Sequence, residues 1–215
     1  SKSEIIEIER IAISKKKIVD IGIRLNPNTD AKTLKQISTG KKENKFGVDE
    51  KIFFNLVNYS KLSNNINLRC LSVHIGSQIM DHKPYEKMLK VVDRIIKKSN
   101  HKFDFIDLGG GMGISYEKSN KKLNYPKYNI AIKKLLKSHK SKIIFEPGRS
   151  IVGNIGSLIS KVIYIKENDK KDFIILDAAM NDLMRPALYG ANHRTLPAIR
   201  TNQTSKKIYE FVGPI

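Results

Sequence analysis

Short apolar segments alternate with amphipathic segments through residues 1–149, and this rhythm constrains the fold more than any other feature. The apolar segments end near Asn26, Val48, His74, Gly109 and Glu146. The last three positions are 35 and 37 residues apart, which is the length of one strand followed by one helix. Such alternation predicts a parallel sheet covered by helices. An open doubly wound sheet and a (β/α)8 barrel both fit this spacing.

The predicted helices share apolar side chains at helical spacing and cover residues 3–13, 49–62, 85–99 and 128–140. The predicted strands are rich in isoleucine, valine and phenylalanine and cover residues 17–27, 66–76, 103–111 and 142–149. We expect Ser3 to cap the first helix. Residues 28–44 are predicted to form a loop, and residues 45–48 a short strand.

The pattern changes after Arg149. The segments that follow are strand-like, are separated by turn residues without a convincing helix between them, and cover residues 150–168, 171–182 and 206–215. We therefore predict two domains, an α/β domain over residues 1–149 and a β-rich domain over residues 150–215. Because the sequence stops at Ile215 in mid-pattern, at the end of a strand-like segment, we expect the second domain to be truncated.

The composition favours a globular protein with a basic, solvated surface. The chain has 40 lysine and arginine residues against 21 acidic ones, a formal net charge of +19. The lysines are scattered in short pairs without an arginine-rich stripe or interleaved aromatic residues, so we predict no nucleic-acid partner. No apolar run of about 18 residues predicts a membrane span. The single cysteine, Cys70, has apolar neighbours that predict a small buried residue and a reducing, cytoplasmic location.

Four glycines lie within the five residues 109–113, directly after an apolar segment. A glycine-rich turn after a strand lets backbone N–H groups approach a phosphate. A dinucleotide-binding fingerprint would require a third glycine at the position of Ile114, and a phosphate-binding P-loop would require a lysine directly before Ser115. Both signatures are absent. A tight turn without a ligand remains an alternative.

Different polar groups fall at three successive strand ends. His74 and Ser77 follow one strand, the glycine turn follows the next, and Glu146 and Arg149 follow the third. In a parallel barrel, successive strand ends line one mouth, where ligands bind. Taken singly, His74 could be a core histidine, and Glu146 and Arg149 could form a local ion pair. Together the three groups indicate a binding site.

Four separated motifs resemble those of the diaminopimelate decarboxylases, which are pyridoxal-phosphate enzymes with an alanine-racemase-like barrel. The motifs are HIGSQI (74–79), DLGGGMGISY (107–116), EPGRSIVGNIG (146–156) and DAAMNDLMRPALYGANH (177–193). The resemblance covers nearly the whole chain in the expected order. It implies the later part of a (β/α)8 TIM-type barrel followed by the start of a β-sandwich or β-barrel domain.

The resemblance also implies pyridoxal 5'-phosphate as the cofactor. The residues that match cofactor-binding positions are His74, Ser77, Gly109, Gly110, Gly111, Glu146, Pro147, Gly148 and Arg149. The glycines and Ser77 would bind the phosphate, and His74 would stack on the ring. Glu146 would face the pyridine nitrogen, where a carboxylate favours the protonated ring.

Arg149, Arg185 and Tyr189 resemble substrate-binding residues of the family. Diaminopimelate carries a carboxylate at its non-reacting end, and a guanidinium binds a carboxylate through two parallel hydrogen bonds. For Arg185 the alternative is a surface ion pair, and for His193 we favour local packing. Leu34 stands where the family commonly has a histidine.

According to the resemblance, the catalytic residues lie outside this chain. The family's Schiff-base lysine lies upstream on the first barrel strand, and a cysteine, an acidic residue and a tyrosine follow the segment 211–215, partly across a dimer interface. We therefore expect an internal fragment that does not decarboxylate by itself. We assign no metal site.

The full-length protein is expected to be a cytoplasmic homodimer that converts meso-2,6-diaminopimelate to L-lysine and CO2 in lysine biosynthesis. Its partner would be a small-molecule amino acid, with no nucleic acid and no membrane. One alternative is a related decarboxylase acting on arginine, ornithine or carboxynorspermidine. Another is a non-catalytic cofactor-binding or basic interaction protein.

Overall fold

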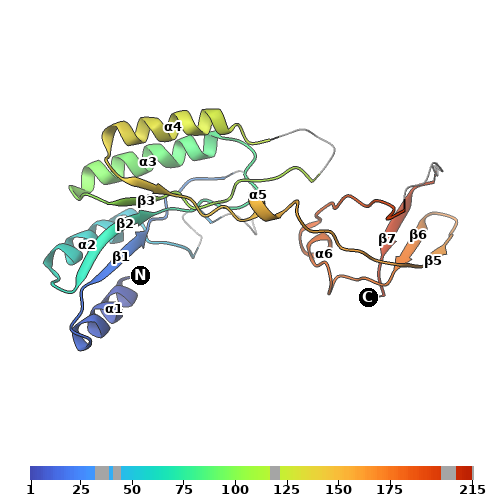
Figure 1. The fold of residues 1–215 in the computed structure, drawn as a ribbon, viewed down its shortest axis with the longest axis horizontal. Helices are drawn as coiled ribbons and strands as arrows, with labels where there is room; N and C mark the ends of the chain where they lie inside the picture. Colours follow the sequence, from blue (N-terminus) through green and yellow to red (C-terminus); the bar gives the residue numbers. More distant parts are fainter. Residues whose placement is uncertain (32–38, 41–44, 117–121, 200–206, 215) are drawn as a thin grey trace. The chain divides into compact units, whose positions relative to one another are not determined.

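The computed structural model describes residues 1–31, 39–40, 45–116, 122–199 and 207–214. It divides into two compact units. The first consists of Ser1–Ile114 with Lys121–Asn154, and the second of Ser115–Asn120 with Ile155–Ile215. Figure 1 shows the course of the chain through both units, which are described separately below.

The first unit is built on a parallel sheet with the strand order β1-β2-β3-β4. The strands cover β1 Val19–Arg24, β2 Ile66–Ser72, β3 Phe105–Asp107 and β4 Lys142–Ile144. All neighbours pair in parallel, as the alternation of strands and helices predicted. The short strand predicted at residues 45–48 is wrong, because Val48 forms only an isolated parallel bridge with Leu25. The predicted loop 28–44 lies largely outside the described residues.

The longer helices of this unit, within the described residues, are α1 Lys2–Ser14, α2 Glu50–Leu62, α3 Lys83–Ser99 and α4 Tyr125–Ser138. Helices α3 and α4 lie side by side over the sheet (Figure 1). The predicted cap of the first helix is wrong: Ser1, not Ser3, is the N-cap. The Ser1 hydroxyl accepts from the Glu4 N–H, while the Glu4 carboxylate accepts from the Ser1 amino group. Only Ser1 has a glutamate three residues later, which this reciprocal cap requires.

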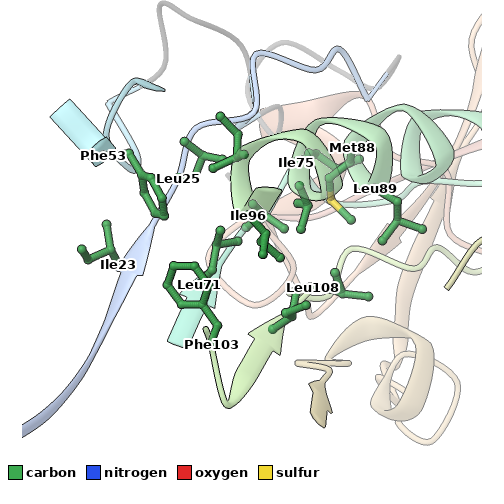
Figure 2. Close-up of a cluster of buried hydrophobic side chains, with 14 of the residues drawn as sticks. Ile23, Leu25, Phe53, Leu71, Ile75, Met88, Leu89, Ile96, Phe103 and Leu108 are labelled. Carbon is green, nitrogen blue, oxygen red and sulfur yellow. The ribbon is translucent and has the colours of Figure 1, made fainter. Parts of the chain in front are cut away.

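The core of the first unit lies between the sheet and its helices. Helix α3 buries one stripe at helical spacing, including Met88, Val92 and Ile95. Figure 2 shows how side chains of α2, α3 and the strands meet in this core, with Phe53 and Leu71 among them. Full burial of one such side chain contributes roughly 1.5–3 kcal/mol.

Cys70 on β2 is only partly buried, so the prediction of a buried residue is wrong. Its Cβ lies 3.1 Å from the place where a Cβ of Gly22 would be. Because glycine offers no side chain to cover the neighbouring strand, the sulfur stays partly accessible. The partial burial of Cys70 raises the pKa of its thiol.

The second unit contains a three-stranded sheet with the order β5-β6-β7. The strands are β5 Val162–Lys166, β6 Asp172–Leu176 and β7 Tyr209–Val212, with β5 antiparallel and β7 parallel to β6. The strand predicted over residues 150–168 is wrong in its first half. There the chain forms the short helix α5, Arg149–Val152, which belongs to the first unit. Helix α6, Arg185–Tyr189, was not predicted from the sequence.

An ion-pair network joins α2 to α3. Both Arg94 guanidinium nitrogens donate to the Glu50 carboxylate at 2.8 Å, and the Lys98 ammonium donates to it at 3.2 Å. These hydrogen bonds lower the pKa of Glu50 to about 2. A carboxyl group whose pKa is lowered on folding stabilises the protein above its unfolded pKa and loses this contribution as the pH falls through the folded value.

We therefore expect Glu50→Gln to lower the free energy of unfolding by about 1 kcal/mol at pH 7, a figure discounted for the partial exposure of the pair. The deficit should shrink as the pH falls from 4.5 toward about 2. Urea denaturation at pH 7 and pH 3.5 measures both values. The matched variant Glu7→Gln removes an exposed pair within one helix and should have a smaller effect. A deficit equal at both pH values would contradict the assignment.

Among the described residues, no helix combines the length and hydropathy needed to cross a membrane.

Candidate functional site

Three turns of the first unit meet at the carboxyl ends of β2, β3 and β4. His74 follows β2, the glycine turn follows β3, and Glu146 follows β4. The Gly110 N–H donates to the His74 Nδ1 at 3.1 Å, and the Glu146 N–H donates to the Gly109 carbonyl at 3.0 Å. The structure thus joins through hydrogen bonds the three strand ends that sequence analysis singled out.

The approach of the neighbouring turns leaves no room for side chains on the glycine turn. A Cβ on Gly110 would lie 2.1 Å from the Glu146 carbonyl oxygen, and one on Gly111 would lie 2.0 Å from the Gly76 carbonyl oxygen. Gly111 also has a φ of 88°, which side chains disfavour. The turn therefore presents bare backbone, as a phosphate-binding loop requires.

The three glycine N–H groups differ in what they already bind. The Gly109 N–H donates to the Asp107 carboxylate at 2.8 Å, and the Gly110 N–H donates to His74. Within the described residues, the Gly111 N–H has no hydrogen-bond acceptor. The resemblance predicted backbone donors from all three glycines; among the described residues, Gly111 is the one of the three whose N–H is free.

Asp107 shapes the start of the glycine turn, and sequence analysis did not identify it. Its carboxylate is only 8 % exposed, and it accepts from the Ser72 hydroxyl at 3.0 Å as well as from Gly109. An aspartate that binds the N–H two residues on is a common turn device. Its position directly before the leucine and the glycines could have signalled this role.

The His74 imidazole is neutral at physiological pH. Burial lowers the pKa of His74, and the positive charge of Arg24 lowers it further. A neutral ring with the proton on Nε2 leaves Nδ1 free to accept from Gly110. Arg24 ends β1 and lies 5.0 Å from the centre of the Phe46 ring. Sequence analysis missed Arg24 because the segment after its strand, Leu25-Asn26-Pro27, resembles none of the motifs that identified the site.

Gln78 ties Arg149 to the glycine turn. Its Oε1 accepts from Arg149 Nη1 and from the Ile114 N–H, both at 3.2 Å. Ser77 is partly buried, whereas Glu146 is exposed and Pro147 and Gly148 follow it in the loop before α5. The predicted cofactor-binding residues therefore belong to the turns after β2, β3 and β4 of the first unit, except Arg149, which begins α5 of the same unit.

The predicted substrate residues Arg185 and Tyr189 belong to the second unit, at the two ends of α6. Arg185 Nη1 lies 3.0 Å from His193 Nε2, and its guanidinium lies 4.5 Å from the centre of the Tyr116 ring. His193 also meets the Tyr116 ring edge-on. Tyr189 is 38 % exposed. The roles of Arg185 and Tyr189 stay predictions, and Leu34 lies outside the described residues.

The lysines of the described residues are all solvent-exposed. Among them, none has the buried strand-end position that the resemblance expects for a lysine bound to the cofactor. Within the same residues, no group of histidine, cysteine and acidic side chains could hold a metal ion.

Comparison with known proteins gives a family match over most of the chain. Residues 1–153 match the family model of the pyridoxal-dependent decarboxylases, specifically their pyridoxal binding domain. This segment includes the turns after β2, β3 and β4, and it ends one residue before the end of the first compact unit at Asn154.

Relatives and solved structures agree with this match. The chain is 39 % identical to a diaminopimelate decarboxylase of Aquifex aeolicus, covering 100 % of this chain and 52 % of the relative. It is also 39 % identical to one of Neisseria meningitidis, covering 99 % and 51 %. The structure of the Helicobacter pylori diaminopimelate decarboxylase complexed with L-lysine is 41 % identical, with a TM-score of 0.90, covering 100 % of this chain and 54 % of that one. The chain spans about half the length of these relatives.

Proposed function

Because the chain belongs to the pyridoxal-dependent decarboxylase family and carries its pyridoxal-binding domain, we propose that it binds pyridoxal 5'-phosphate within a diaminopimelate decarboxylase. The reaction is the conversion of meso-2,6-diaminopimelate to L-lysine and CO2. The observation that carries this proposal is the bare glycine turn, held between His74 and Glu146 by hydrogen bonds. Close packing against the neighbouring turns keeps side chains off this glycine turn, and a bare backbone turn can offer its N–H groups to a phosphate.

The residues at the three turns suit the parts of the cofactor. Gly111 offers a free N–H to the phosphate, and Ser77 lies in the turn beside it. Neutral His74 would pack on the ring face, and the Glu146 carboxylate would favour the protonated pyridine nitrogen. When bound, pyridoxal phosphate would supply an electron sink for the loss of the substrate carboxylate as CO2. Pro147 and Gly148 position Glu146 and Arg149 around it.

By their resemblance to the family's motifs, Arg149, Arg185 and Tyr189 are assigned to substrate binding, and the carboxylate at the non-reacting end of the substrate suits an arginine. This assignment rests on the motif match and on the fork geometry of arginine. The contacts of Arg185 with His193 and Tyr116 fix its guanidinium, so less side-chain entropy is lost when the carboxylate binds. The relatives' names support diaminopimelate as the substrate.

We extend the proposal to the architecture of the full-length protein. The parallel sheet of the first unit is the later part of a (β/α)8 barrel, and residues 150–215 begin a β-rich domain. The full-length protein is a cytoplasmic homodimer that engages neither nucleic acid nor membrane. The βα spacing supports the barrel, the single cysteine the cytoplasmic location, and the scattered lysines the lack of a nucleic-acid partner. The homodimer rests on the resemblance to the family.

A substrate panel tests the proposed function. The full-length gene product, loaded with pyridoxal phosphate, is expected to release CO2 from meso-2,6-diaminopimelate with a kcat/KM at least ~100-fold above those for ornithine, arginine and carboxynorspermidine, because each of these presents a different group to the arginines. The 215-residue chain by itself is expected to release none. A higher kcat/KM for another member of the panel would overturn the substrate assignment.

A further inference from the structure

Tyr85 reaches the glycine turn from inside the core. It lies in the first turn of α3, it is fully buried, and its hydroxyl donates to the Gly110 carbonyl at 3.0 Å across 25 residues of chain. Burial raises the pKa of Tyr85, so the hydroxyl keeps its proton at neutral pH and remains a donor. Sequence analysis placed Tyr85 at the start of a helix and gave it no role at the site.

This hydrogen bond fixes the orientation of one peptide group. In a trans peptide, the carbonyl of one residue and the N–H of the next point in opposite directions. The Gly110 carbonyl points toward Tyr85 in the core, so the Gly111 N–H points away from the core. This N–H is also the one without an acceptor among the described residues.

The peptide between Gly110 and Gly111 needs such a restraint. Glycines on both sides allow the peptide to rotate with little steric resistance. If it rotated, the Gly111 N–H would turn away from the phosphate and the Tyr85 hydroxyl would lose its acceptor in the core. A buried polar group without a partner is costly, so the tyrosine opposes this rotation.

We propose that Tyr85 is a positioning residue for the cofactor phosphate: its hydroxyl holds the Gly110 carbonyl and thereby aims the Gly111 N–H at the phosphate. The inference rests on the proposed function, since it requires a phosphate at the glycine turn. Tyr85 does not touch the phosphate itself and acts only through the peptide group.

Tyr128 provides a matched control within the same layer. Its ring stacks on that of Tyr85 with 4.4 Å between centroids, and the side chain is 3 % exposed. Among the described residues, the Tyr128 hydroxyl has no hydrogen-bond partner. Tyr128→Phe therefore removes a buried hydroxyl from the same ring pair without touching the glycine turn.

The experiment compares Tyr85→Phe with Tyr128→Phe in the full-length gene product. Dissociation constants for pyridoxal phosphate and for unphosphorylated pyridoxal are measured by absorbance titration, and thermal unfolding checks the fold. Tyr85→Phe is expected to weaken binding of pyridoxal phosphate about fivefold, the loss typical of one neutral hydrogen bond, and to leave pyridoxal binding unchanged. Tyr128→Phe should change neither.

The remaining outcomes separate the two proposals. If Tyr85→Phe binds pyridoxal phosphate as tightly as wild type, or loses affinity for both compounds equally, the positioning role is wrong while the phosphate site stands. If the wild-type protein binds both compounds equally, the phosphate site itself is wrong, and the role of Tyr85 with it.

Discussion

The substitution Gly111→Ala is expected to weaken the binding of pyridoxal phosphate by about a hundredfold. Two costs combine at this position. The φ of 88° is unfavourable for alanine, and the new Cβ would lie 2.0 Å from the Gly76 carbonyl oxygen, so the turn after β2 or the glycine turn must move. Together these amount to about 3 kcal/mol, which corresponds to the expected loss.

Titration of the full-length gene product with the cofactor measures this effect, and urea denaturation reports any loss of stability. Gly156→Ala is the matched control, because Gly156 has a negative φ and an added Cβ there meets nothing within 4 Å. It should bind the cofactor like wild type. Wild-type affinity in Gly111→Ala would show that the glycine turn does not hold the phosphate.

Regular elements of the first unit could be predicted because local pattern and tertiary packing agree in them. Helix α2 begins after Asp49, whose side chain accepts from the Ile52 N–H, and it buries Phe53, Leu56 and Val57 at helical spacing. The residues predicted for this helix were 49–62, nearly the observed bounds. Where an N-cap residue, a periodic apolar face and a following strand segment all indicate the same helix, the sequence alone is sufficient to predict its bounds.

The region after Arg149 was harder to predict for a physical reason. Its apolar residues come in short runs, which do not distinguish a strand from one turn of helix. Ile151 and Val152 were expected in a strand and instead lie in α5, where both are exposed. Without a buried face, neither the helical nor the strand periodicity of apolar residues can be recognised in the sequence.

The residues of the candidate site also fall into two groups, those that could be predicted from the sequence and those that could not. His74, the glycines and Glu146 could be found because each directly follows an apolar strand, and parallel strands bring their carboxyl ends to one edge. Tyr85 and Gln78 contribute through contacts with Gly110 and Ile114 that only the packed structure brings within reach. These contacts depend on how α3 and the turn after β2 pack against the sheet, and a local sequence pattern does not predict that packing.

The substitution Arg185→Ala is expected to lower kcat/KM for diaminopimelate about a thousandfold in the full-length gene product. In the proposed site this arginine binds the carboxylate at the non-reacting end. Two hydrogen bonds between charged groups contribute about 4 kcal/mol, and their loss raises the transition-state energy by that amount. Ornithine has an amine at its far end, so its low kcat/KM should not fall with the substitution.

Decarboxylation of both substrates by wild type, Arg185→Ala, Arg185→Lys and Arg194→Ala measures the effect. Lysine keeps the charge but only one donor group, so Arg185→Lys should recover part of the loss. Arg194 is an exposed arginine on the same segment, and its removal should leave both rates unchanged. If Arg185→Ala retains the wild-type kcat/KM for diaminopimelate, the guanidinium does not bind the distal carboxylate. Arg185 is the residue expected to favour diaminopimelate, with its distal carboxylate, over ornithine, with its distal amine. If its removal does not change this preference, a related decarboxylase with a different substrate becomes the better assignment.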